Sequence, residues 1–274
     1  TAKRRWWLMA QEAPSVSVVV PTYNEAANLG ELTRRLFAAT KDFGEVELLF
    51  ADDESEGTAE SEAVVRRLQA EGYAVRMHVR RRGEGRGLSS AVILGFQLAK
   101  FDTLVCMDAD LQHEPEAVPS IAAPVLAGRA QFAIGSRNVQ DGGVGFDWSL
   151  RRRIISKGAT MLAWFLTSST DPMSGFFCVE RHIVDDAKRN GLNARGFKIA
   201  LEIMVRAKCR TVEDVPITFR DRHAGESKLT AKQNIEYLKQ LVSLYIFLYT
   251  PLLVAGFMAL LALGAAYFLL LFFS

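Results

Sequence analysis

The chain has 274 residues, which is enough for one substantial α/β core and a small appendage. Its 33 lysine and arginine residues nearly balance its 31 aspartate and glutamate residues, so no surface of the kind that binds nucleic acid is indicated. The three cysteines, Cys106, Cys178 and Cys209, are far apart and lack metal-site spacing, which predicts reduced, mostly buried thiols and a cytosol-facing domain.

Residues 1–14 form a segment that is basic and aromatic at positions 3–7. Its apolar part is too short for the hydrophobic region of a signal peptide. Two interpretations remain open: a segment at the membrane surface, where tryptophan and arginine are favourable, or a disordered tail. The folded domain is predicted to begin at residue 15.

From residue 16 onward, β-branched and apolar runs alternate with segments whose apolar residues recur at helical spacing. Strands are predicted at 16–20, 46–51, 73–79 and 104–107, with a helix after each of the first three. Such alternation is typical of a mostly parallel, doubly wound α/β sheet, which binds its ligands at the carboxyl ends of the strands.

Polar clusters stand at the carboxyl ends of three of these strands: residues 21–25, Asp52-Asp53, and residues 108–112. In a parallel sheet all three open on the same edge. Asp108 and Asp110, with Gln112, offer the hard oxygen ligands that Mg2+ or Mn2+ prefers. Helix capping is the alternative, but it predicts one acidic or hydroxyl residue per turn instead of paired carboxylates.

A glycine-rich stretch at 83–87 lies between a predicted strand and a predicted helix, as in a dinucleotide-binding fingerprint. Its spacing is Gly-x-Gly-x-Gly, and it follows the third strand instead of the first. A flexible turn is therefore the better interpretation, and a nicotinamide-dependent dehydrogenase is disfavoured.

The second half of the domain contains further polar turns. A short strand at 132–135 leads to Ser136-Arg137, and a glycine-rich loop at 141–148 follows, long enough to move over a substrate. A helix is predicted over 151–165, where Arg152 and Ser156 are neighbours four residues apart; a solvated basic face is the alternative for 151–153. A strand is also predicted at 216–219, before a basic loop.

The composition changes near the end, because no charged residue follows Lys239. Residues 231–249 are predicted to form an interfacial amphipathic helix, and residues 250–274 a transmembrane anchor, since 251–273 are uniformly apolar over 23 residues. Lysines on the near side of the span place residues 1–249 in the cytosol by the positive-inside rule.

Together these motifs resemble the dolichyl-phosphate mannose synthases, which are family 2 inverting glycosyltransferases with the GT-A fold. The resemblance covers about residues 15–240, and the GT-A catalytic domain is assigned to 15–230. The motifs that carry it are Val-Val-Pro-Thr-Tyr-Asn-Glu at 19–25, Asp52-Asp53, Met-Asp-Ala-Asp-Leu-Gln-His at 107–113, Gly-Ser-Arg at 135–137, Ile-Ile-Ser-Lys-Gly-Ala at 154–159 and Gly-Glu-Ser-Lys-Leu at 225–229.

The resemblance implies roles for individual residues. The guanosine is expected to be held by Pro21, Tyr23, Glu25 and Asp53, with Ala51 alongside, and the divalent ion on the diphosphate by Asp108, Asp110 and Gln112, with Ala109 between them. Phosphate contacts are expected from Arg137, Arg222 and Lys228, and contacts to the lipid phosphate from Arg152 and Ser156. Catalysis is assigned to Asp110, Arg137, Arg152 and Ser156.

Two positions depart from the family pattern. Glu54-Ser55 stands where Gly-Ser is usual, and the turn at 171–175 differs from the common Asp-Leu-Thr-Gly-Ser, which leaves the role of Asp171 open. His113 is expected to be a polar neighbour of the metal turn and not a catalytic base.

The implied reaction is transfer of mannose from GDP-mannose to dolichyl phosphate with inversion, at the endoplasmic reticulum membrane if the source is eukaryotic. No obligatory protein subunit and no nucleic acid are expected as partners. Two alternatives remain: a polyprenyl-phosphate transferase that uses a UDP-sugar such as UDP-glucose, and a catalytically silent, membrane-anchored scaffold that binds nucleotide. A processive polymerase is disfavoured, because one span cannot form a channel.

Overall fold

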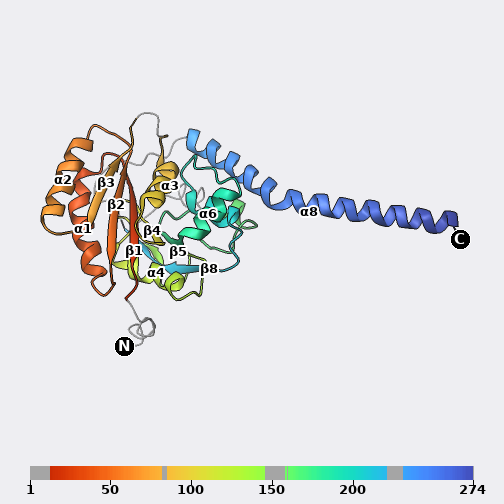
Figure 1. Ribbon diagram of the computed structural model, residues 1–274, viewed down its shortest axis with the longest axis horizontal. Coiled ribbons are helices and arrows are strands. Elements are labelled where there is room, and N and C mark those ends of the chain that lie inside the picture. Colours follow the sequence, from red (N-terminus) through yellow and green to blue (C-terminus); the bar gives the residue numbers. More distant parts are fainter. Residues whose placement is uncertain (1–12, 82–84, 146–157, 159, 221–230, 274) are drawn as a thin grey trace.

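The computed structural model describes residues 13–81, 85–145, 158, 160–220 and 231–273. A seven-stranded sheet lies between two layers of helices, and one long helix projects away from it (Figure 1). The strand order is β3-β2-β1-β4-β7-β5-β8. The strands of this sheet are β1 (Val16–Thr22), β2 (Val46–Asp52), β3 (Val75–Val79), β4 (Thr103–Cys106), β5 (Phe132–Ser136), β7 (Phe177–Glu180) and β8 (Val212–Pro216).

The first half of the sheet is parallel, as predicted, because each strand is followed by a helix that returns the chain to the starting edge. Alternate residues of β1 face opposite layers. Val18 packs toward α1, while Val19 packs toward α3. The helices of this half are α1 (Ala26–Ala39), α2 (Thr58–Ala70) and α3 (Leu88–Leu98).

The second half contains one reversal, because β7 runs antiparallel between β4 and β5. The sheet is therefore mostly parallel, in agreement with the predicted GT-A class. The short strands β6 (Gly143–Val144) and β9 (Thr218–Phe219) form a separate parallel pair. The remaining elements are the short 3-10 helix η2 (Pro115–Ala117) and the helices α4 (Val118–Leu126), α6 (Arg181–Arg189) and α7 (Ile199–Arg206).

The strand predicted at 216–219 is wrong in extent. The chain forms β8 over Val212–Pro216 beside β5, then places the buried Ile217 against Gly135, and continues as β9. Polar residues within β8 interrupt the apolar pattern by which a strand is predicted from sequence. One of them, Asp214, accepts hydrogen bonds from Ser169 and Thr170, so its place in the sheet depends on contacts distant in sequence.

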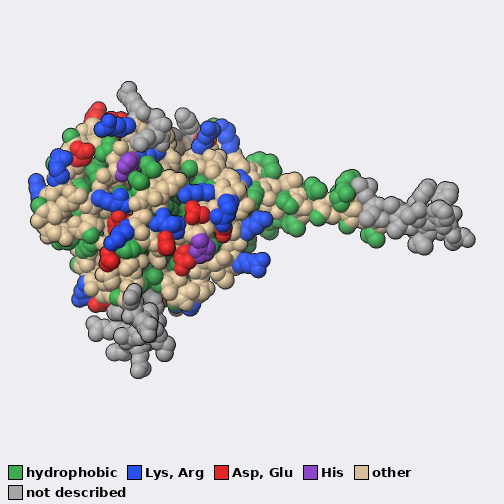
Figure 2. All heavy atoms as spheres, in the orientation of Figure 1, with side chains coloured by type: hydrophobic (Ala, Val, Ile, Leu, Met, Phe, Trp, Pro, Cys, Tyr) green, Lys and Arg blue, Asp and Glu red, His purple; other side chains and the backbone are tan. Residues whose placement is uncertain are grey.

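The C-terminal helix α8 (Ala231–Phe273) is continuous, and Pro251 lies inside it. Proline removes one backbone donor, and here the helix continues past it. The predicted interfacial and transmembrane segments are thus parts of one helix. Its stretch Ile235–Leu260 is long and apolar enough to cross a membrane. Figure 2 shows hydrophobic side chains along the projecting part, whereas charged side chains gather over the domain.

The first half of α8 packs against the domain on one face. Tyr237, Leu241 and Leu244 are buried in a cluster with Leu201 and Val205 of α7. The opposite face carries a stripe of exposed apolar residues at helical spacing. Its members are Ile235, Leu238, Val242 and Ile246.

The three cysteines are free thiols; Cys106 and Cys178 are buried and Cys209 is half-buried, as predicted. The helix predicted over 151–165 falls mostly outside the described residues, although 158 and 160–163 are helical. The glycine-rich turn at 83–87 and the loop at 141–148 are described only in part, and the latter contributes β6.

The packing of α3 on β1 gives a stability prediction. A Cβ on Gly95 would overlap with Cγ1 of Val19, whose branched side chain is fully buried. We expect Gly95→Ala to lower the free energy of unfolding by about 1–3 kcal/mol. The matched control is Gly30→Ala in α1, where the new Cβ meets only the flexible Arg34 side chain and helix propensity should add about 0.5–1 kcal/mol.

Both variants would be compared by denaturant unfolding. Equal stability of the two alanine variants would contradict the close approach of α3 to β1.

Candidate active site

A cleft of about 470 Å3 opens at the carboxyl ends of β1, β2 and β4. It contains seven of the residues predicted from sequence, which come from three separate strand ends. These are Pro21, Tyr23, Glu25, Asp53, Asp108, Ala109 and Asp110. The rest of the lining is formed by the start of α3, by Gly196 and Phe197, and by Gln233 and Glu236 of α8.

The loops after β1 and β2 are bonded to each other. Asn24 adopts a left-handed φ of 59°, its side-chain Oδ1 accepts a hydrogen bond from Gly57 N at 3.0 Å, and its own N–H donates to Ser55 Oγ at 3.2 Å. Glu25 accepts from Asn28 Nδ2 at 2.8 Å. This places Tyr23, which is 42% exposed, at the rim of the cleft.

The two adjacent aspartates after β2 have different environments. Asp52 is fully buried and accepts hydrogen bonds from the hydroxyls of Thr22 at 2.9 Å and Thr58 at 2.7 Å, so it holds the two loops. Asp53 lines the cleft, pairs with buried Arg80 and accepts from Gly87 N at 2.6 Å. It thereby fixes the start of α3.

Ala51 was predicted to lie alongside the nucleoside. The structure places it within β2 with its side chain 1% exposed, outside the lining of the cleft.

Asp108 and Asp110 follow β4 and both line the cleft. The turn is tight, since Leu111 has a left-handed φ of 60° and Gln112 N donates to Asp110 Oδ1 at 3.1 Å. Two carboxylates suit Mg2+ or Mn2+, which complete their coordination with water and substrate phosphates. The side chains present therefore fit a divalent ion.

Gln112 does not join the two carboxylates at the cleft surface. It is 4% exposed, is not among the lining residues, and its Nε2 donates to the carbonyl of Arg220 at 3.0 Å. Within the part of the chain that the structure describes, no group of three histidine, cysteine, aspartate or glutamate side chains is placed to hold a metal. Of the three residues predicted to hold the ion, Asp108 and Asp110 thus line the cleft and Gln112 does not.

His113 supports the turn that carries Asp108 and Asp110. It is 2% exposed, its Nδ1 accepts a hydrogen bond from Asp108 N at 3.2 Å, and its ring packs against Phe176 and Phe219. Burial lowers the pKa of His113 to about 4, because the charged form loses its hydration. The imidazole is therefore neutral near pH 7, and its Nδ1 acts as a hydrogen-bond acceptor for the backbone.

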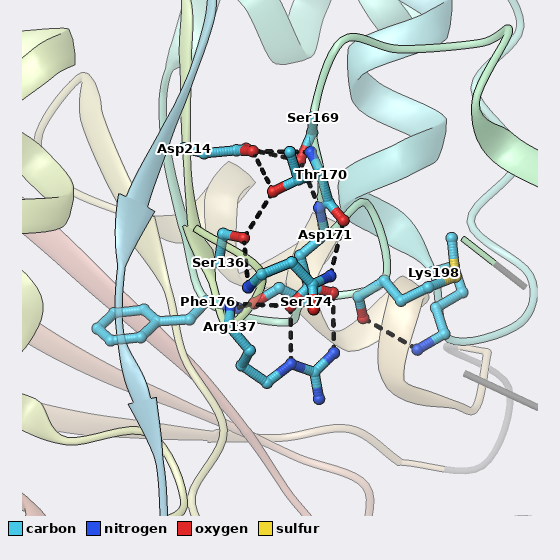
Figure 3. A network of polar contacts seen from close by, with 11 residues as sticks. Ser136, Arg137, Ser169, Thr170, Asp171, Ser174, Phe176, Lys198 and Asp214 are labelled. Carbon is cyan, nitrogen blue, oxygen red and sulfur yellow. Dashed lines mark hydrogen bonds and ion pairs between the residues drawn. The ribbon is translucent and has the colours of Figure 1, made fainter. Parts of the chain in front are cut away.

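Arg137 is held by Asp171, whose role the sequence left open (Figure 3). The guanidinium donates from Nε to Oδ2 at 2.7 Å and from Nη2 to Oδ1 at 2.8 Å, and it stacks over the ring of Phe219 at 5.1 Å. The side chain of Asp171 is 1% exposed and that of Arg137 14%. Such a two-point pair fixes the orientation of the guanidinium plane.

Lys198 is a half-buried cation that the sequence analysis missed. Its Nζ donates to the carbonyl of Met173 at 3.0 Å, within the same polar network (Figure 3). Burial and, after it, the nearby charge of Arg137 lower the pKa of Lys198 to about 8. No local sequence signal distinguishes this lysine from an exposed one, because its position depends on the 171–175 turn.

Four predicted residues lie outside the described residues. They are Arg152 and Ser156, expected at the lipid phosphate, and Arg222 and Lys228, expected at the donor phosphates.

Comparison with known proteins identifies relatives of the chain. The model of glycosyl transferase family 2 matches residues 17–187. A dolichol-phosphate mannosyltransferase of Mycosarcoma maydis is 46% identical over 242 residues, covering 85% of this chain and 80% of that protein. A dolichol-phosphate mannosyltransferase of Saccharomyces cerevisiae is 44% identical over 238 residues, covering 84% of this chain and 87% of that protein.

A similar fold occurs in a solved structure. It is the glucosyl-3-phosphoglycerate synthase of Mycobacterium tuberculosis in complex with Mn2+, UDP and glucosyl-3-phosphoglycerate, with a TM-score of 0.60. The match covers 85% of this chain and 79% of that one at 18% identity, so it supports the fold alone.

The contact between Gly175 and Asp108 gives a first prediction for the site. A Cβ on Gly175 would lie 3.1 Å from Oδ1 and 3.2 Å from Oδ2 of Asp108, which is closer than carbon and oxygen normally pack. We expect Gly175→Ala to displace the carboxylate and weaken Mn2+ binding by about 10- to 100-fold with little change in stability. Calorimetric titration with Mn2+ would measure this, and an unchanged affinity would contradict it.

The buried pair of Arg137 and Asp171 gives a second prediction. Asp171→Asn removes the charge that balances the guanidinium, so we expect the free energy of unfolding to fall by about 3 kcal/mol. The rate of sugar transfer should fall by about 10- to 100-fold, because Arg137 is no longer held in place. Chemical unfolding and turnover assays would test both effects.

The matched control for this variant is Glu213→Gln, which breaks an exposed pair with Arg129 and should change stability by less than about 1 kcal/mol. Wild-type stability and turnover in Asp171→Asn would show that the pair does not position Arg137.

Proposed function

The chain belongs to glycosyl transferase family 2, and we propose that it transfers mannose from GDP-mannose to dolichyl phosphate with inversion, releasing GDP. It is a glycosyltransferase, and its similarity to dolichol-phosphate mannosyltransferases extends over more than four-fifths of its length. The observation that carries the proposal is the convergence of three strand ends, with Tyr23, Asp53 and the carboxylates of Asp108 and Asp110, on one cleft.

In this proposal the donor lies along the cleft from the β1 and β2 ends to the β4 end. Pro21, Tyr23, Glu25 and Asp53 hold the guanosine, and the diphosphate lies by Asp108, Ala109 and Asp110. A divalent ion held by Asp108 and Asp110 would neutralise charge on the diphosphate as a Lewis acid. The carboxylate of Asp53 is already paired with Arg80. Asp53 would therefore contact the guanosine through its backbone and through one edge of that carboxylate.

The acceptor needs orientation instead of deprotonation. A phosphate monoester has a second pKa near 6, so it is already anionic at neutral pH. One of its oxygens attacks the anomeric carbon of the mannose as the bond from that carbon to the GDP oxygen breaks, and GDP leaves with the electron pair. Attack from the opposite face inverts the centre. His113 is buried and its Nδ1 already accepts a hydrogen bond from the backbone of Asp108, which supports a reaction without a histidine base.

The main barrier is the approach of an anionic phosphate to a sugar whose leaving group is also anionic. Cations fixed before the reaction lower this barrier because they need no reorganisation during it. Arg137, held by Asp171, and Lys198, bonded to Met173, are proposed as two such cations, although neither is among the described residues that line the cleft. Arg222 and Lys228 are proposed to bind donor phosphates, and Arg152 with Ser156 the lipid phosphate.

The lipid acceptor explains the long apolar helix. Each buried methylene of an isoprenoid resists transfer to water by about 0.8 kcal/mol, so the enzyme must bring its site to the membrane. The apolar stretch of α8 fits a single-pass anchor. We propose that the catalytic domain lies on the cytosolic side of the endoplasmic reticulum membrane, in line with the lysines that precede the span.

A transfer assay in detergent micelles tests the proposed reaction. Radiolabelled GDP-mannose and UDP-glucose would each be offered with dolichyl phosphate, in the presence of Mg2+, Mn2+ or EDTA. We expect labelled lipid from GDP-mannose alone, and its loss with EDTA, because without the cation the carboxylates of Asp108 and Asp110 would repel the anionic diphosphate. Transfer only from UDP-glucose would contradict GDP-mannose as the donor. Binding of nucleotide without transfer of sugar would favour the catalytically silent scaffold.

A further inference from the structure

The helix that carries the apolar span also forms part of the cleft. Gln233 and Glu236 lie in the first two turns of α8, and both line the same cleft as Asp108 and Asp110. Figure 1 shows α8 beginning at the end of the domain away from the N-terminus, beside α3. From its sequence, α8 is expected only to anchor the chain, and none of the residues assigned to the donor or acceptor comes from it.

A buried polar network fixes the rotation of α8 about its axis. Glu202 of α7 is 1% exposed and accepts hydrogen bonds from Gln240 Nε2 at 2.9 Å, Asn193 N at 3.0 Å and Arg206 Nε at 3.2 Å. Arg206 in turn donates to Ser243 Oγ at 2.8 Å. A buried carboxylate is costly unless each oxygen is bonded, so this arrangement disfavours any other rotation of α8.

The network and the cleft residues share one face of the helix. Glu236 and Gln240 are four residues apart, and Gln233 precedes Glu236 by three, so the three lie in one row. Fixing Gln240 against Glu202 therefore also fixes Gln233 and Glu236 against the cleft. Apolar contacts of Tyr237, Leu241 and Leu244 support the same orientation.

The chemistry of this wall suits a sugar better than a phosphate. Glu236 is a carboxylate, whose charge would repel a phosphate oxygen, although Lys239 pairs with it at 2.8 Å on the outer side of the helix. Sugar hydroxyls, in contrast, donate to carboxylates and exchange hydrogen bonds with amides. The half-buried ring of Phe197 beside them offers an apolar surface to the carbon face of a hexose.

We propose that Gln233 and Glu236 bind the hydroxyl groups of the donor hexose, so that the membrane helix forms the sugar-binding wall of the active site. This inference rests on the proposed function for the cleft itself and goes beyond it in assigning the sugar contacts to α8. In the proposed function the strand ends bind the nucleoside and the diphosphate, so the two parts of the donor would be recognised by different elements.

The test separates sugar recognition from nucleotide recognition. The full chain in detergent micelles, as Glu236→Gln and as Gln233→Ala, would be assayed for kcat/KM with GDP-mannose and for the inhibition constant of GDP. We expect kcat/KM to fall by about 10- to 100-fold in each variant, as for loss of a hydrogen bond to a charged or buried group. The inhibition constant of GDP should stay within about twofold, which also shows that the variants fold.

Lys239→Ala is the matched control, because it removes one ion-pair partner of Glu236 and leaves the residues that line the cleft unchanged. Its kcat/KM should match the wild type. An equal fall of kcat/KM in Glu236→Gln and Lys239→Ala would show that Glu236 acts through its ion pair with Lys239, and this result would overturn the inference. So would unchanged kcat/KM in both cleft variants, or a parallel loss of affinity for GDP.

The wild type reports on the proposed function independently. If it uses UDP-glucose instead of GDP-mannose, the donor proposal fails, but the same variants assayed with UDP-glucose and UDP still decide the role of α8. If it transfers sugar from neither donor, the proposed function and the sugar wall are both overturned.

Discussion

The charged groups of this site depend on one short turn, residues 171–175. Asp171 holds the guanidinium of Arg137, the carbonyl of Met173 accepts from Lys198, and Gly175 packs against the carboxylate of Asp108. A buried ion pair is stable only when its geometry is good and its remaining oxygens are bonded, and here both conditions hold. One turn therefore sets the relative positions of two cations and of the carboxylate that is proposed to bind the metal.

A second set of contacts connects this site to the membrane helix. Lys198 precedes α7, its carbonyl accepts a hydrogen bond from Gln240 of α8, and Gln240 also bonds to the buried carboxylate of Glu202. Partly or fully buried hydrogen bonds thus connect Lys198 and α7 to the apolar helix. The proposed reaction has a lipid acceptor, and a connection of this kind would help to hold its reaction centre at the membrane surface.

Local patterns in the sequence were sufficient to predict the alternating strands and helices, the mostly parallel sheet and the three polar strand ends that meet in the cleft. What they could not predict depends on contacts across the chain. Asp171 lies 34 residues from Arg137, the position of Lys198 is set by the carbonyl of Met173, and Gln112 is turned away by the backbone of Arg220. The predicted extent of β8 was wrong for the same reason, because the carboxylate of Asp214 accepts hydrogen bonds from Ser169 and Thr170, which are distant in the sequence.

The product itself gives the most direct test of the reaction as a whole. Dolichyl phosphate would be incubated with the full chain, Mn2+ and GDP-mannose labelled with 13C at the anomeric carbon, and the one-bond carbon–hydrogen coupling of the purified lipid would be measured by NMR. A single in-line displacement predicts one product, β-mannosyl phosphate. An α-mannosyl phosphate would contradict direct attack by the acceptor, and a labelled sugar in water without labelled lipid would contradict a phosphate acceptor.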